Sequence, residues 1–95
     1  MSLAKVNGID ISYEEHGSGL PIVFIHELAM DASGWNAQLA YLAPRYRAIA
    51  LNLRGFPPSS VPASETEYSQ DVLVDDVRAL LDSLGVEKAV LVGHG

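Results

Sequence analysis

The sequence predicts an α/β fold in which an antiparallel hairpin is followed by a parallel strand–helix–strand–helix–strand unit. Short β-branched runs without polar alternation, at residues 22–25 and 88–92, are typical of strands buried on both faces. The segments between the strands carry apolar residues at a spacing near 3.6, which indicates amphipathic helices. Strands that alternate with helices favour a parallel sheet covered on both sides.

The first part of the chain predicts three strands. Residues 9–14 alternate apolar and polar side chains, and Val6 precedes Asn7-Gly8, a pair that favours a tight hairpin turn. Residues 16–19 form a glycine-rich break, and Pro21 then opens the buried strand at 22–25.

The middle of the chain predicts a short helix over residues 34–43, ended by Pro44, and a strand over 46–53. Three prolines within residues 54–62 predict a long loop.

The last predicted helix follows Ser69, a favourable N-cap, and ends before Gly85, a favourable C′ residue. We expect one face to be apolar (Leu73, Val77, Leu80, Leu81, Leu84) and the other to be a solvated polar face (Asp71, Asp75, Asp76, Arg78, Asp82). The strand at 88–92 then leads into Gly93-His94-Gly95.

Composition limits the classes of function. The 95 residues correspond to one domain or a piece of one, and six basic residues against twelve acidic ones give a net charge of −6. Neither a nucleic acid nor a membrane is therefore expected as a partner, and no apolar run approaches the roughly 20 residues that span a bilayer. The absence of cysteine agrees with a cytoplasmic location. The spacing of the three histidines predicts no metal site, and no cofactor is expected.

Polar clusters follow each of the three predicted parallel strands: His26-Glu27-Leu28, residues 52–55, and Gly93-His94-Gly95. Ligands of such sheets bind beyond the carboxyl ends of the strands. The sequence therefore predicts a functional site at one rim.

The chain resembles the N-terminal part of the α/β-hydrolase fold superfamily, of the esterase, epoxide hydrolase and haloperoxidase type. The resemblance rests on the ordered set formed by residues 14–26, by Leu51-Asn52-Leu53-Arg54-Gly55 and by Val90-Leu91-Val92-Gly93-His94. In that family the last segment continues as Gly-x-Ser-x-Gly, the nucleophile elbow. The resemblance implies that residues 1–95 are the N-terminal segment of a single domain.

Position 95 matches the family's nucleophile, but Gly95 has no side chain. It is either a replacement, engineered or natural to a non-catalytic relative, or the result of a chain boundary at the elbow. The resemblance also implies a further acid and base C-terminal to the elbow, so we expect the isolated chain to be inactive. A C-terminal remainder is expected, as a covalent continuation or as a partner chain.

The resemblance assigns an oxyanion-stabilising backbone N–H to Leu28. Glu27 replaces the glycine usual after His26, and it either turns to solvent, pairs with Arg54 or faces the site. His26 either organises the loop through hydrogen bonds or binds substrate, and His94 either lines the pocket or packs beneath the elbow. Phe56 is either a loop anchor or a ligand contact. Asn52, where many relatives have aspartate, is expected to tie the loop through its side chain.

These residues predict a hydrolase that, when complete, acts on a small ester, lactone or related substrate through a nucleophile at the elbow. The alternative is a non-catalytic relative that binds a small ligand or a protein through the same rim. A third possibility is a self-standing interaction module of 95 residues, against which an exposed apolar strand edge argues.

Overall fold

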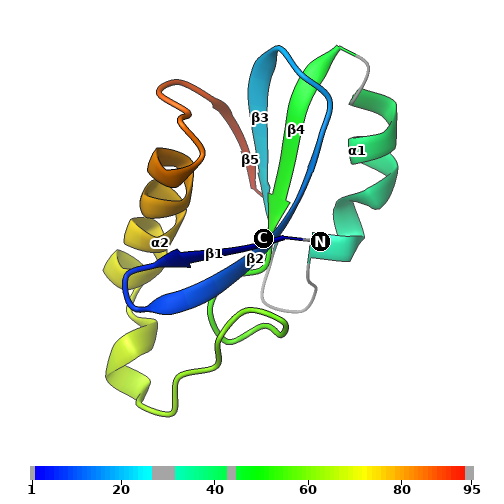
Figure 1. Cartoon of the computed structure of the whole chain (residues 1–95). Coiled ribbons are helices and arrows are strands. Elements are labelled where there is room, and N and C mark those ends of the chain that lie inside the picture. The colour runs from blue at the N-terminus through cyan, green and yellow to red at the C-terminus, as the bar shows by residue number, and fades with distance from the viewer. Residues whose placement is uncertain (1, 27–31, 43–44, 94–95) are drawn as a thin grey trace.

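The computed structural model describes residues 2–26, 32–42 and 45–93 (Figure 1). Five strands form one mixed sheet in the order β1-β2-β4-β3-β5. The strands are β1 (Ser2–Val6), β2 (Ile9–His16), β3 (Leu20–Ile25), β4 (Tyr46–Leu51) and β5 (Val90–Gly93). The pairs β1-β2 and β2-β4 are antiparallel, whereas β4-β3 and β3-β5 are parallel. The predicted α/β architecture is confirmed.

The predicted hairpin is present. Val6 pairs with Ile9, and the two turn residues Asn7 and Gly8 have φ angles of 52° and 79°. Two consecutive left-handed residues form the turn whose twist matches that of the flanking strands, and asparagine and glycine tolerate this conformation best.

Helices cover both faces of the sheet, α1 (Asn36–Leu42) on one side and α2 (Gln70–Ser83) on the other (Figure 1). Neighbouring residues of β4 alternate between the two layers. Ala48 and Ala50 pack with Trp35 and Leu39 beneath α1, whereas Ile49 and Leu51 pack in a larger cluster with Leu80 of α2.

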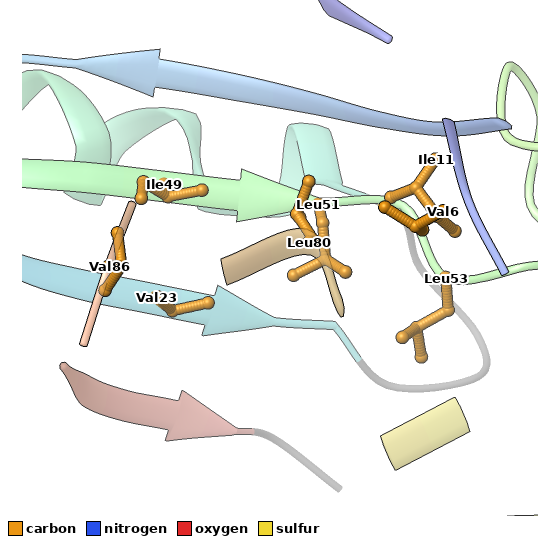
Figure 2. Packing of buried hydrophobic residues seen from close by; sticks show 8 residues of the cluster. All are labelled: Val6, Ile11, Val23, Ile49, Leu51, Leu53, Leu80 and Val86. Atoms are coloured by element: carbon orange, nitrogen blue, oxygen red, sulfur yellow. The ribbon is translucent and has the colours of Figure 1, made fainter. Parts of the chain in front are cut away.

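Figure 2 shows this larger cluster, in which Leu80 projects from α2 onto the sheet beside Leu51. The cluster also brings in the hairpin through Val6 and Ile11 and the segment after α2 through Val86. It therefore joins the hairpin, the parallel strands and α2 into one core.

The first helical region differs from the predicted helix at 34–43. A 3-10 turn, η1 (Ala32–Trp35), precedes α1, which ends at Leu42. The indole of Trp35 packs on Phe24, with ring centroids 5.0 Å apart. Trp35 was included in the predicted helix because of its apolar spacing. It does face the core, but from the 3-10 turn, since a residue in such a turn can be buried as well as one in an α-helix.

The boundaries of α2 agree with the predicted signals. The Ser69 side chain accepts a hydrogen bond from the backbone N–H of Val72, and Gly85 has a φ angle of 72°. A 3-10 turn that the sequence did not predict, η2 (Glu65–Tyr68), leads into the helix.

Two predictions for strands were wrong. β4 ends at Leu51 rather than at 53, because the backbone N–H of Leu53 donates to the side chain of His26 and not to a neighbouring strand. β5 is not buried on both faces: Val90 and Leu91 are 48% and 57% exposed. Within the described residues β5 pairs with β3 alone, so one edge and much of its apolar surface stay uncovered.

No helix among the described residues is both long enough and apolar enough to cross a lipid bilayer.

Candidate functional site

The carboxyl ends of β4, β3 and β5 lie level with one another. Ile25 pairs with Leu51 on one side and with Gly93 on the other. The clusters that follow these strands therefore begin at one rim of the sheet, as predicted. Four residues assigned to the site, namely Glu27, Leu28, His94 and Gly95, lie outside the described residues.

His26 is at this rim, directly after β3, and only 3% of it is exposed. Its Nε2 accepts a hydrogen bond of 3.0 Å from the backbone N–H of Leu53. A ring nitrogen that accepts a hydrogen bond is unprotonated, so a neutral His26 carries its proton on Nδ1. This bond joins the segments that follow β3 and β4, so His26 makes the kind of loop-organising hydrogen bond that the sequence suggested. Its contact with a substrate stays a prediction.

Phe56 lies against His26, with ring centroids 4.6 Å apart and an edge-on angle of 69°. It also packs on the core cluster beneath α2, as a loop anchor would, while its contact with a ligand stays a prediction. A hollow of about 250 Å³ adjoins it, and the lining of this hollow includes Leu53, Val61 and Tyr68. The structure thus brings His26 and Phe56 together at the rim and leaves apolar space beside Phe56.

Asn52 ties the loop to the hairpin, as predicted. Its Nδ2 donates to Ser12 Oγ at 2.7 Å, and its backbone oxygen accepts from Ser59 Oγ at 2.5 Å. Ser59 Oγ in turn accepts from the backbone N–H of Ser12 at 2.8 Å. All three residues are buried. Each buried polar group is therefore paired within the network, which holds the loop after β4 against β2.

The largest feature that the sequence did not predict is a buried ion pair. Arg54 and Asp76 are 4% and 0% exposed, and Arg54 donates to Asp76 from Nε at 2.5 Å and from a terminal nitrogen at 2.7 Å. Asn7 Nδ2 adds a third hydrogen bond to Asp76, at 3.1 Å. The placement of Asp76 on the solvated face of α2 was therefore wrong.

A signal for this burial exists in the helical spacing. Asp76 lies three residues after Leu73 and four before Leu80, so it shares the face that packs on the sheet. A pairing of Arg54 with Glu27 was one of the alternatives, but Glu27 lies outside the residues that the structure describes. The structure shows that Asp76 is a partner of Arg54.

Within residues 2–26, 32–42 and 45–93, no group of three or more His, Asp or Glu side chains is placed to hold a metal ion.

The family model of the alpha/beta hydrolase fold matches residues 21–94. Epoxide hydrolase 2 of Siraitia grosvenorii is 39% identical over 91 residues, which are 95% of this chain and 29% of that protein. A putative non-heme chloroperoxidase of Synechocystis sp. is 41% identical over 86 residues, 90% of this chain and 30% of that protein.

Solved structures agree with this family. An epoxide hydrolase of Bacillus megaterium, in complex with an inhibitor, superposes with a TM-score of 0.94 at 31% identity and covers 98% of this chain and 33% of its own. One from Vigna radiata has a TM-score of 0.94 at 38% identity, with 98% of this chain and 30% of its own covered. The chain thus spans about three tenths of the length of these relatives. Because the family model covers most of the chain, residues 21–94, the chain belongs to the α/β-hydrolase fold family.

Proposed function

We propose that the chain is the N-terminal segment of a hydrolase that acts on a small epoxide, ester or lactone at the rim formed by β4, β3 and β5. The carrying observation is the level alignment of Leu51, Ile25 and Gly93, which starts all three polar clusters at one edge. The relatives named epoxide hydrolases support an epoxide, a small electrophilic substrate. A reducing cytoplasm suits a chain without cysteine.

The proposed mechanism requires a nucleophilic side chain at position 95, which Gly95 lacks. Once restored, that nucleophile attacks a carbon of the substrate and either breaks the C–O bond of an epoxide or adds to the carbonyl of an ester or lactone. The backbone N–H of Leu28 and the amide after position 95 stabilise the oxyanion that develops. His26 and Phe56 support the wall of the site and contact the substrate together with Glu27 and His94. The acid and base that activate the nucleophile and water come from a C-terminal remainder, so residues 1–95 alone do not turn over substrate.

We further propose that this remainder is a covalent continuation that covers β5. An apolar hollow of about 420 Å³ lies between α2 and β5, with Val77, Leu81 and Leu91 in its lining. Leu91 in this lining and its neighbour Val90 are both exposed, and the chain spans 29–30% of the relatives' length. An uncovered apolar strand edge favours association, which a continuing strand and helix prevent.

Intact-mass electrospray of the denatured natural protein tests the covalent continuation. We expect a mass roughly three times the 10.2 kDa of these 95 residues, because they span 29–30% of the relatives. A mass of 10.2 kDa contradicts a covalent remainder and leaves a partner chain, which native mass spectrometry then detects as a complex.

Restoring a nucleophile tests the catalytic assignment. In the protein with its remainder, we expect Gly95→Asp to hydrolyse an aryl epoxide, or Gly95→Ser to hydrolyse a p-nitrophenyl ester, on the order of 10³-fold or more faster than Gly95→Ala. Gly95→Ala is the matched control, since it adds a side chain without a nucleophilic atom. The proposal is contradicted if the Gly95→Asp and Gly95→Ser variants fold but hydrolyse their substrates no faster than Gly95→Ala.

The second candidate is a non-catalytic relative that binds a small ligand at the same rim, and Gly95 is the observation that favours it. It predicts that neither variant gains turnover, whereas a small epoxide or ester still protects the amides of residues 52–56 from hydrogen exchange. Turnover by either variant shows that the rest of the catalytic machinery is present, which favours the hydrolase over this candidate.

A further inference from the structure

The Arg54–Asp76 pair lies in the protein interior, where an ion pair contributes little net stability. Removing two charges from water is costly, and an apolar pair of similar volume is often as stable or more so. Asp76 accepts two hydrogen bonds from Arg54 and one from Asn7. Energetics alone therefore do not explain these charges, and their geometry is the informative feature.

The three hydrogen bonds that Asp76 accepts join three parts of the fold. Asn7 belongs to the β1-β2 turn, Asp76 to α2, and Arg54 to the loop that follows β4 at the rim. A bidentate guanidinium–carboxylate pair has a defined orientation, unlike a single hydrogen bond. Asp76 therefore fixes where the backbone at position 54 lies relative to the helix.

From Arg54 the contacts continue to the site. The preceding residue, Leu53, donates its N–H to His26 Nε2 at 3.0 Å. Segment 27–31, which contains Leu28, begins directly after His26. The network of Ser12, Asn52 and Ser59 holds the same loop against β2.

We propose that Asp76 is a positioning residue: through Arg54 it holds the N–H of Leu53 on His26 Nε2, and so sets the strand end from which the oxyanion-forming segment departs. This inference rests on the proposed function, because the catalytic consequence requires Leu28 to act as an oxyanion donor. The structural part, the alignment of Leu53 with His26, stands without it.

The test replaces the ion pair by an apolar pair, Arg54→Met with Asp76→Val, in the protein with its C-terminal remainder. This double variant leaves no buried charge unpaired. Asp75→Asn, one residue away on the exposed side of α2, is the matched control. The readouts are the ¹⁵N resonances of the His26 ring, the exchange rate of the Leu53 amide, and kcat and KM in the Gly95→Asp or Gly95→Ser background.

In the double variant we expect the His26 Nε2 resonance to shift and the Leu53 amide to exchange at least tenfold faster, while the unfolding midpoint in urea stays near that of the parent. We expect kcat to fall about 10²-fold with KM nearly unchanged, since a misplaced donor loses transition-state contacts. Asp75→Asn keeps all parental values.

The proposal is overturned if the double variant folds and its His26 ring resonances, Leu53 amide exchange rate and kcat all equal those of the parent protein. If that variant does not fold, Arg54→Lys is measured by the same criteria. Lysine keeps the positive charge but lacks the planar guanidinium that donates two hydrogen bonds to one carboxylate. If no position 95 variant turns over substrate, the proposed function fails, whereas the resonance and exchange measurements still decide whether Asp76 positions His26.

Discussion

Replacing Asp76 by asparagine is expected to lower the free energy of unfolding by about 3–5 kcal/mol. The substitution keeps the size of the side chain but leaves the Arg54 guanidinium, 4% exposed, without its countercharge. An uncompensated buried charge is among the most destabilising defects in a folded protein. Urea denaturation followed by far-UV circular dichroism measures the loss.

Two comparisons make the Asp76 prediction specific. Asp75→Asn removes the same charge from the exposed side of α2 and is expected to change the free energy of unfolding by less than about 0.5 kcal/mol. The double variant Arg54→Met/Asp76→Val is expected to recover most of the loss. A loss below about 1 kcal/mol for Asp76→Asn is inconsistent with a buried pair.

Leu80→Ala is expected to cost about 2–5 kcal/mol of unfolding free energy. Leu80 is fully buried where α2 meets the sheet, in the cluster that also contains Leu51, Val23 and Val6 (Figure 2). The truncation removes apolar contact and leaves a cavity between elements that the rest of the core holds apart. The midpoint and slope of urea denaturation give the change.

Leu3→Ala is the control for this prediction because it makes the same chemical change on β1, where Leu3 is 58% exposed. We expect a change within about 0.5 kcal/mol. Equal losses at positions 3 and 80 are incompatible with a core centred on α2 and the sheet.

Local signals were sufficient for most elements of the fold. The Asn7-Gly8 turn, the Ser69 cap and the Gly85 end of α2 were predicted from residue types, because each depends on backbone angles or on a bond within a few residues. The rim was also predicted, since it follows from the order of strands and helices. The start of the first helix was less accurate, because apolar spacing does not distinguish a 3-10 turn from an α-helical one.

The candidate site was predicted less completely. His26 and Asn52 were identified because each follows a strand, but their partners were not: Ser12 and Ser59 are separated by 47 residues along the chain, and Asn52 and Ser12 by 40. No pattern in a single sequence pairs such residues. The pairing arises only when β2 and β4 adjoin in the sheet.

The sequence by itself determined the α/β class, the family resemblance, the shared rim and the missing nucleophile side chain at position 95, since these depend on residue type and order. Only the tertiary structure decided the environment of Asp76 and of β5. Asp76 is buried because Arg54 and Asn7 reach it from 22 and 69 residues away. The apolar run at Val90 and Leu91 stays exposed because burial depends on what lies beside a strand, and the described residues place only β3 there.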